Sequence, residues 1–392
     1  MEKKKKPEIR FEGFTDDWEQ RKLEDEAIEM LAGGDIDKSR VVESGKYPIY
    51  ANALTNDGIV GYYDDYYRVK APAVTVTGRG DVGHAQARTV DFTPVVRLLA
   101  IRSEHDAYFL ENAINNHGVI VESTGVPQLT VPQLGNYMIQ FPKTIEEETK
   151  IGEYFDNLDH LITLHQRKYE KLKNLKKSML KKMFPQKGCK VPGIRFSGFT
   201  DDWEQRKLLL ICDFEKGRGL SKDNIDNNGK YPCILYGQLF TDYGMFINTV
   251  YSKSNIISEE CKLSEKGDIL IPRCDTTPDG LGRASVLALD NVILGFDINI
   301  LKIKNKQKYD SGFVSVALNH HKKDLLSKVV GSTVRHLENK ELRDVSIEYP
   351  NSLEEQKKVG EYFQALDHLI TLHQRELEKL KNIKKTLLEK MF

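Results

Sequence analysis

Residues 144–184 of this 392-residue chain occur twice, and this duplication limits the architectures that the chain can adopt. The second copy spans residues 352–392, at an offset of 208, and residues 151–184 match it at 25 of 34 positions without a gap. Internal duplication on this scale indicates two matched structural units within one chain. The sequence therefore predicts a two-fold repeated architecture.

A shorter repeat supports the same interpretation. Residues 9–23 return at 194–208, and only one of the 15 positions differs. The repeat carries both tryptophans of the chain, Trp18 and Trp203, which we interpret as parts of a structural junction rather than as base-stacking residues. The matched frame also reaches back from the long repeat to about Val126 in the first half.

Both copies of the long repeat predict helices. Apolar residues recur every seven positions, the spacing of a coiled-coil or helix-bundle seam, and each copy opens with a Ser/Thr-x-x-Glu capping box. Pairing the two helices with each other would bury both stripes, so we expect an antiparallel coiled coil. The predicted seam residues are Leu158, Leu161, His165, Leu172, Leu175, Leu366, Leu369, His373, Leu380 and Ile383.

Two histidines lie on this predicted seam. His165 and His373 occupy matched positions near the middle of their helices, where antiparallel pairing would bring them face to face. We interpret them as a polar contact that sets the register, with a metal site or a pH switch as the alternative.

The segments between the repeats read as strands and turns. The β-prone runs are 73–77, 95–102, 267–272, 286–289 and 298–303, and helices are expected at 108–115 and 315–326. The expected fold class is α/β (α+β), with two mixed α/β domains related by pseudo-two-fold symmetry and separated by the two long helices. The expected boundaries are 1–143 for the first domain, 144–185 for the central helix, 186–351 for the second domain and 352–392 for the C-terminal helix.

Composition narrows the compartment and the class of partner. Basic and acidic residues balance at 58 each, which on average argues against nucleic acid. Between Arg167 and Lys182, however, eight residues are basic and one is acidic, so this face is either solvated or directed at DNA phosphates.

No apolar run is long enough to span a membrane, and no apolar signal core follows the basic start. The five cysteines lack C-x-x-C spacing, so we expect reduced thiols and a cytoplasmic protein.

Motifs of common enzymes are missing from the sequence. Both Gly-Lys pairs are followed by Tyr, which removes the Walker A phosphate loop, and neither G-x-S-x-G nor H-E-x-x-H occurs. The chain has no Pro-Pro pair, so the Asn/Asp-Pro-Pro-aromatic motif of amino-group methyltransferases is absent. No catalytic residue and no metal site is therefore predicted.

Glycine-dense loops after the β runs hold most of the candidate contact residues. Glycine allows close approach of the backbone, and arginine can fork onto guanine edges or phosphates. Arg79-x-Asp81 can be laid on Arg273-x-Asp275 at an offset of 194. The candidate DNA-binding residues are Lys46, Tyr62, Arg79, His84, Arg88, Lys230, Arg273, Thr276 and Arg283, with Lys173 and Lys177 on the basic helix.

The layout resembles the specificity subunit of type I restriction–modification systems over essentially the whole chain. The resemblance is carried by FTDDWEQRKL at 14–23 and 199–208, LEEQKKVGEYF at 353–363, LDHLI at 158–162 and 366–370, and GDILIPR at 267–273. It implies two target-recognition domains, each of which reads one half of a bipartite, asymmetric DNA sequence, and two helices that space them.

The resemblance also implies partners. These are double-stranded DNA, two adenine-N6 methyltransferase subunits and, in the full complex, two restriction subunits, with no membrane. S-adenosylmethionine, ATP and Mg are expected on the partner subunits and no cofactor on this chain. Individual base contacts do not follow from the resemblance, because the recognition domains are the variable part of the family. Two alternatives stay open: a scaffold that binds proteins rather than DNA, and an enzyme, which the missing motifs disfavour.

Overall fold

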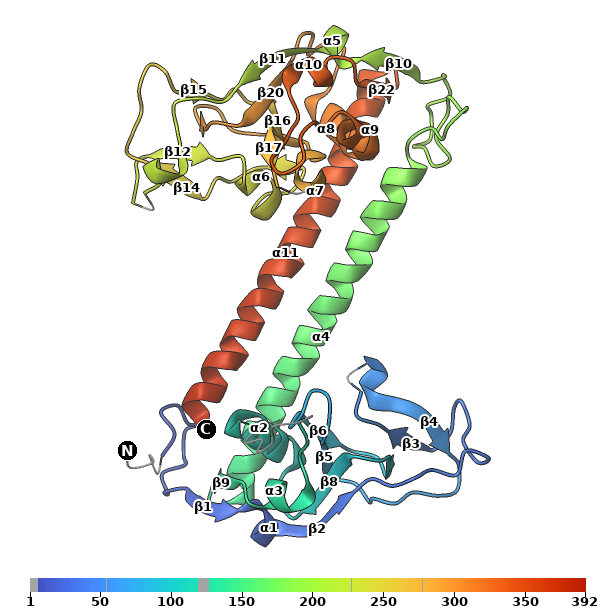
Figure 1. The fold of residues 1–392 in the computed structure, drawn as a ribbon, viewed down its shortest axis with the longest axis vertical. Coiled ribbons are helices and arrows are strands. Elements are labelled where there is room, and N and C mark those ends of the chain that lie inside the picture. Colours follow the sequence, from blue (N-terminus) through green and yellow to red (C-terminus); the bar gives the residue numbers. More distant parts are fainter. Residues whose placement is uncertain (1–5, 54, 119–126, 227, 277) are drawn as a thin grey trace. The chain divides into compact units, whose positions relative to one another are not determined.

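The computed structural model describes residues 6–53, 55–118, 127–226, 228–276 and 278–392, so Val126 lies outside the described residues. The chain divides into two compact units. Unit 1 contains residues 1–165 and 376–392, and unit 2 contains residues 166–375. The two predicted long helices are present as α4 (Ile145–Lys182) and α11 (Leu353–Met391), and each unit holds one part of each helix (Figure 1).

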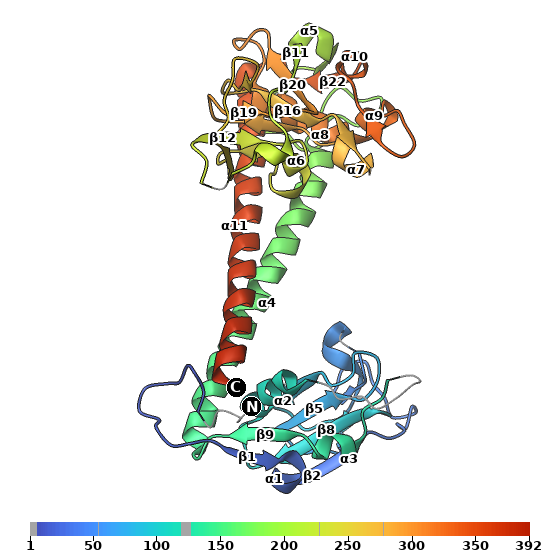
Figure 2. The ribbon, with the colours of Figure 1, turned by 60° about the vertical axis from the view of Figure 1, so that its left-hand side comes forward.

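The first domain, in unit 1, is built on a four-stranded sheet with the strand order β2-β8-β5-β6, and helix α2 packs against it (Figure 2). A second sheet has the order β4-β3-β7, and a ribbon pairs β1 with β9. The element bounds are β1 Glu19–Lys22, α1 Leu23–Glu26, β2 Ala27–Ala32, β3 Tyr47–Tyr50, η1 Thr55–Gly58, β4 Ile59–Tyr63, β5 Ala73–Thr77, β6 Ala85–Arg88, β7 Thr93–Pro94, β8 Leu98–Ser103, α2 Ala107–His117, α3 Val131–Gly135 and β9 Met138–Phe141.

The second domain, in unit 2, repeats this plan with a five-stranded sheet, β11-β20-β16-β18-β13, and a four-stranded sheet, β14-β12-β19-β15. Two ribbons, β10-β22 and β17-β21, complete it. The element bounds are β10 Glu204–Lys207, α5 Leu208–Ile211, β11 Cys212–Lys216, η2 Lys222–Asn224, β12 Tyr231–Ile234, α6 Gln238–Thr241, β13 Phe246–Ile247, β14 Ser252–Ser254, β15 Lys262–Leu263, β16 Ile269–Pro272, β17 Cys274–Asp275, α7 Pro278–Leu281, β18 Ser285–Leu287, β19 Ile293–Leu294, β20 Ile298–Ile303, α8 Ser311–His320, α9 Lys322–Ser327, β21 Arg335–His336, α10 Asn339–Leu342 and β22 Ser346–Tyr349.

Two predicted elements are interrupted in the structure. The β run predicted at 95–102 begins instead with a turn, because Arg97 adopts a left-handed conformation with φ of 72° and β8 starts only at Leu98. The helix predicted at 315–326 is two helices, α8 and α9, separated by His321, whose ψ of 22° breaks the helical path.

A buried glutamate joins α4 to the short repeat. Glu147, 1% exposed, accepts hydrogen bonds from Nε and Nη2 of Arg10 at 2.5 and 2.7 Å. It also accepts a hydrogen bond from Nε1 of Trp18 at 3.3 Å. Since the guanidinium and the indole both donate to this carboxylate, the start of the helix and the N-terminal segment form one structure.

Unit 2 contains the same junction. Glu355, also 1% exposed, accepts from Arg195 at 2.7 and 2.9 Å and from Nε1 of Trp203 at 3.3 Å. The structural junction predicted for the tryptophans is therefore present in both units. Only half of each predicted capping box forms: the backbone N–H of Glu355 donates to Oγ of Ser352 at 3.3 Å, but the carboxylate turns to Arg195.

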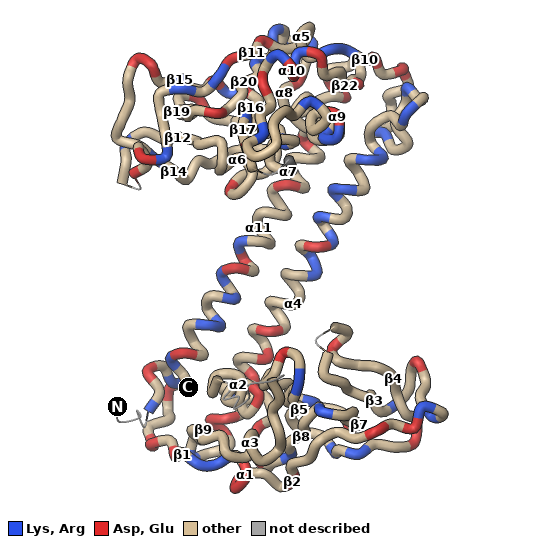
Figure 3. Tube along the Cα trace, viewed as in Figure 1, with Lys and Arg blue, Asp and Glu red and all other residues tan. Residues whose placement is uncertain are grey.

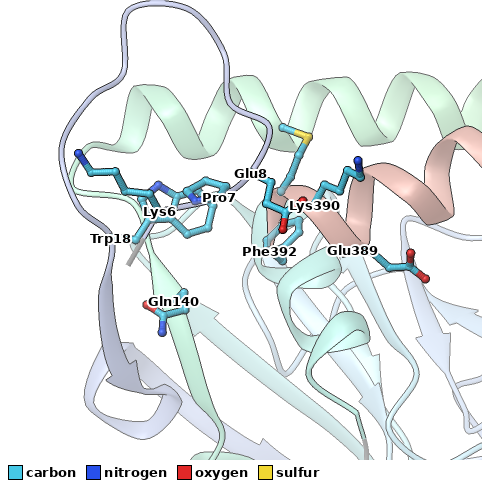
Figure 4. Close-up of a pocket in the computed structure, with 9 residues that line it drawn as sticks. Lys6, Pro7, Glu8, Trp18, Gln140, Glu389, Lys390 and Phe392 are labelled. Atoms are coloured by element: carbon cyan, nitrogen blue, oxygen red, sulfur yellow. The ribbon is translucent and has the colours of Figure 1, made fainter. Parts of the chain in front are cut away.

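The last residue of each long repeat also packs into a domain core. Phe184 lies 5.5 Å, between ring centroids, from Trp203, and Phe392 lies 6.1 Å from Trp18. In unit 1 the backbone N–H groups of residues 8 and 9 donate to the carbonyl of Lys390 at 2.8 and 3.1 Å. Figure 4 shows this region, where a pocket of about 100 Å³ is lined by both ends of the chain.

Within each unit an ion pair links the two long helices. In unit 1, Nζ of Lys384 lies 2.6 Å from both carboxylate oxygens of Asp159. In unit 2, the matched pair is Lys176 with Asp367, and Asp367 also accepts the backbone N–H of Met245 at 2.6 Å. Because the start of one helix meets the end of the other in each unit, the helices run antiparallel there, as predicted.

The predicted seam is only partly formed. Leu158 and Leu366 are buried, but Leu161, Leu175 and Leu369 are exposed. The buried faces of α4 and α11 pack into the domain cores, where residues of both helices lie together. A seam contact of the three exposed leucines stays a prediction. Leu172, Leu380 and Ile383 are partly buried and pack against the two cores.

The two seam histidines belong to different units. His165 lies in unit 1 and His373 lies in unit 2. The register-setting contact between them stays a prediction.

A glycine in each long helix allows a second helix to begin directly against it. A Cβ at Gly152 would lie 2.1 Å from Oδ1 of Asp106, the residue that caps α2 by accepting from the N–H of Phe109. A Cβ at Gly360 would lie 3.1 Å from Oδ1 of Asp310, the residue that caps α8. Because glycine has no side chain, α2 and α8 can each begin directly against a long helix.

The junction predicts a large effect on stability. Glu355→Ala leaves the Arg195 guanidinium buried without its counter-ion, so we expect the free energy of unfolding to fall by about 3–5 kcal/mol. Urea unfolding followed by tryptophan fluorescence measures this loss, since Trp203 touches the altered site. The control is Glu354→Ala, whose exposed carboxylate pairs with Lys358 on the helix surface and contributes little. Equal stabilities for the two variants would contradict the role of the junction.

Candidate nucleic-acid interface

In the first domain, three strands end at one edge. β3 and β7 are parallel neighbours, so their C-terminal ends lie together, and the end of β5 joins them through hydrogen bonds. The N–H of Gly78 donates to Oδ1 of Asn52 at 2.8 Å and to the carbonyl of Arg97 at 3.0 Å. We call residues 51–52, 78–84 and 95–97 the first loop edge.

The second domain has the same arrangement. β12 and β19 are parallel, and the N–H of Gly295 donates to the carbonyl of Ile234 at 2.9 Å. The end of β16 joins them, because the N–H of Arg273 donates to the carbonyl of Asp297 at 2.7 Å. We call residues 235–236, 273–276 and 295–297 the second loop edge.

Backbone hydrogen bonds set the alignment of the two edges. Gly78 accepts from the N–H of Leu129 at 2.9 Å, and Arg273 accepts from the N–H of Leu337 at 2.8 Å. Gly78 is therefore the counterpart of Arg273, at an offset of 195. The predicted alignment of Arg79 with Arg273 is wrong by one residue, and the two edges present different side chains on matched backbone.

Only some of the predicted contact residues of the first domain gather on its loop edge. Arg79 and His84 lie in the turn between β5 and β6, where His84 is exposed. Lys46 and Tyr62 lie at the opposite end of β3, because Lys46 precedes that strand and Tyr62 pairs with Pro48 near its start. Their contact with DNA stays a prediction.

Arg88 is an internal residue of the first domain. It is 5% exposed, and its guanidinium binds the carboxylate of Asp57 at 3.2 Å, the hydroxyl of Thr75 at 3.0 Å and the amide of Gln86 at 2.7 Å. The guanidinium also stacks 3.7 Å from the ring centroid of Tyr50. With these partners Arg88 holds the turn of η1 onto the sheet, so it is a poor candidate for a base contact.

The second domain divides its predicted residues in the same way. Arg273 and Thr276 lie on the second loop edge, and Arg273 binds Asp297 at 3.0 Å and Glu338 at 2.8 Å. Arg283 donates to backbone carbonyls around α6, at 3.0 Å for that of Phe240, and is thereby committed to the fold. Lys230 precedes β12, away from the loop edge.

The basic residues predicted on the central helix are exposed. Lys173 and Lys177 lie on the part of α4 that belongs to unit 2, and Figure 3 shows further Lys and Arg residues along the same stretch. Nζ of Lys173 lies 3.6 Å from Glu170, a surface pair that a phosphate can displace.

Two features are missing from the described part of the chain. No group of three or more His, Cys, Asp or Glu side chains there is arranged to hold a metal ion, and no helix there is long and apolar enough to cross a membrane. Burial raises the pKa of the Cys212 thiol to about 12 and that of Cys233 to about 11, so both thiols stay protonated at neutral pH.

Comparison with known proteins decides the family. A family model for the type I restriction modification DNA specificity domain matches residues 15–174 and 200–382. The chain belongs to this family. Because the model matches twice, once in each half, the duplication read from the sequence corresponds to two DNA specificity domains.

Individual members of the specificity family support this assignment. The chain is 25% identical over 293 residues to the type I restriction enzyme MjaVIII specificity subunit of Methanocaldococcus jannaschii, which covers 68% of this chain and 64% of that protein. It is 21% identical over 390 residues to a putative type I specificity subunit of Mycoplasma genitalium, covering 96% and 94%. The crystal structure of a type I restriction–modification S subunit from M. genitalium matches with a TM-score of 0.73, 18% identity and 99% coverage of both chains, which confirms the predicted fold class.

Several residues of the loop edges in this specificity-family chain were not predicted from the sequence. Val96, Arg97 and Phe296 were hidden within or beside runs that read as continuous strands. A signal was available in Gly33 and Gly217, matched at an offset of 184. A Cβ at these glycines would lie 1.9 and 2.0 Å from the carbonyl oxygens of residues 95 and 295, so both mark the turn that presents the missed residues.

A substitution of Arg88 tests whether this residue stabilises the fold or contacts DNA. Arg88→Met removes the Asp57 pair and the stacking on Tyr50, and we expect the free energy of unfolding to fall by about 2–3 kcal/mol. Below the unfolding transition, affinity for DNA is expected to stay unchanged. Urea unfolding and a DNA titration measure the two quantities, with the exposed Lys46→Met as control for stability. Loss of DNA affinity in a fully stable Arg88→Met protein would show that the guanidinium reads DNA after all.

Proposed function

We propose that the chain is the DNA-recognition subunit of a type I restriction–modification complex, and that it reads a bipartite, asymmetric sequence without catalysing a reaction itself. The observation that carries this proposal is the pair of loop edges. Their backbone hydrogen bonds match, whereas their side chains differ at each corresponding position, such as Asn52 and Tyr236, or Arg97 and Asp297. A shared frame with different exposed side chains suits two readers of two different half-sites.

The DNA contacts would combine both loop edges with the basic helix. Arg79, His84, Arg273 and Thr276 occupy the loop edges, where arginine and hydroxyl groups are suited to base edges and phosphates. Lys173 and Lys177 would contact phosphates, which positions the complex without carrying sequence information. The remaining candidates, Lys46, Tyr62 and Lys230, would serve as outlying contacts.

The partner surface would lie on the long helices. Leu161 and Leu164 of α4 are 41% and 38% exposed in unit 1, and their counterparts Leu369 and Leu372 of α11 are 40% and 44% exposed in unit 2. Single exposed leucines are ordinary, but a duplicated pair suits two copies of one partner. We assign these surfaces to the two methyltransferase subunits.

The chemistry would belong to the partner subunits. The methyltransferase subunits would carry S-adenosylmethionine and flip the target adenine, and restriction subunits in the larger complex would carry ATP and Mg. This chain would supply only position and sequence choice.

DNA binding is tested by a salt series. With the methyltransferase subunits present, the chain is expected to bind duplex DNA with an affinity that falls steeply as salt rises, because basic residues displace counterions from phosphates. The measurement is a gel shift at several salt concentrations. Lys173→Ala with Lys177→Ala is expected to lower the steepness of log K against log salt concentration by about two. Binding that is absent or insensitive to salt would favour a protein-binding scaffold instead.

The partner surface is tested by altering one unit at a time. Leu161→Lys with Leu164→Lys is expected to leave a complex with one methyltransferase subunit instead of two, because only the surface in unit 1 is changed. Native mass spectrometry gives the stoichiometry, and His160→Lys, at an exposed neighbouring position, is the control. Two bound methyltransferase subunits in the double variant would exclude these leucines from the interface.

A further inference from the structure

An aromatic side chain stands exposed on the second loop edge. Phe296 is 51% exposed in the turn between β19 and β20, although phenylalanine is normally buried. Arg273 and Thr276 belong to the same edge, and the Arg273 guanidinium is paired there with the carboxylate of Asp297. An exposed ring on such an edge suits a partner that offers an apolar surface.

The turn that carries Phe296 is firmly held. The N–H of Phe296 donates to the carbonyl of Leu220 at 3.0 Å, and the next residue, Asp297, is left-handed with φ of 63°. The Asp297 carboxylate binds Arg273 at 3.0 Å. Gly217 lies so close to the carbonyl oxygen of Gly295 that a Cβ there would be 2.0 Å away. The backbone that carries the ring is therefore ordered before binding, so little backbone entropy is left to lose.

The first domain presents an apolar side chain at the same place without sharing the sequence. Val96 is 47% exposed and is followed by Arg97, which is left-handed with φ of 72°. The two turns have the sequences Val-Val-Arg and Gly-Phe-Asp, so each exposes an apolar side chain at its middle position although the residues differ. An apolar group at the tip is thus a shared feature of both loop edges.

An arginine also lies beside each tip. Arg218, which is exposed, donates its backbone N–H to the carbonyl of Leu294 at 2.9 Å, close to the Phe296 turn. Its counterpart is Gly34, and a Cβ at Gly34 would lie 2.8 Å from Nη1 of Arg68. Arg68 therefore brings a guanidinium to the position where the Arg218 side chain begins. Each domain thus has an arginine, a residue type that binds phosphate, near its apolar tip.

We propose that Phe296 is a wedge that packs between neighbouring base pairs in the half-site bound by the second domain. This inference rests on the proposed function. Side chains of this kind partly unstack a base step and kink the duplex, while adjacent cations hold the phosphates. Valine is too small to separate two base pairs, so Val96 makes an apolar contact with a base edge instead. The kink produced by the wedge is therefore confined to one half-site.

The test uses the chain with its methyltransferase subunits and the duplex whose sequence is found by mapping methylated adenines. Phe296→Ala is expected to weaken binding roughly 5- to 150-fold at unchanged salt dependence, because stacking on a base does not displace counterions. 2-Aminopurine placed at positions of the second half-site other than the target adenine is expected to brighten with the native chain, but not with Phe296→Ala. Leu210→Ala, at an apolar residue of α5 that is 60% exposed, is the control.

The outcomes separate this inference from the proposed function. If the native complex shows no salt-sensitive binding to its own sequence, the proposed function and the wedge both fail. If the native complex binds and Phe296→Ala binds within twofold of it, with the same fluorescence, only the wedge is overturned. A fall in the melting temperature of Phe296→Ala that accounts for its weaker binding would also overturn the wedge, because it would assign the ring a structural role.

Discussion

Two buried carboxylates hold the duplicated frame together. Glu147 and Glu355 each lie in the first turn of a long helix. Each is neutralised by an arginine and accepts a hydrogen bond from a tryptophan, and both partners come from a segment well over a hundred residues away. A buried carboxylate without such partners would be strongly unfavourable. The constraint accounts for the arginine and the tryptophan at matched places in the short repeat, because both must reach the same helix start in each unit.

The sequence predicted the parts of the fold that depend on local pattern. Heptad spacing located α4 and α11 to within a few residues, and the β-prone runs at 73–77 and 298–303 coincide with β5 and β20. The predictions from sequence failed where contacts with residues distant in the sequence decide whether a side chain is buried. Leu161 lies on the apolar stripe but no domain covers it, and Arg88 lies in a plausible loop sequence but is enclosed by Asp57 and Tyr50.

The candidate site was harder to predict because its geometry comes from pairing between strands. Arg79 and Arg273 look equivalent in the sequence, yet hydrogen bonds across the edge make Gly78 the counterpart of Arg273. A shift of one residue changes which side chain occupies a given place. The tip residues Val96 and Phe296 share no sequence motif, and only the common turn relates them. Recognition surfaces that diverge on a fixed backbone leave little trace in a single sequence.

The central claim is that each domain reads one half of the DNA sequence independently on a shared frame. The most direct measurement replaces residues 24–123 with the corresponding segment of a relative and maps N6-methyladenine across the genome of a strain that carries the chimaera and its partner subunits. The account predicts that methylation continues and that only one half of the recognised sequence changes. A change in both halves, or an unchanged sequence, would contradict it.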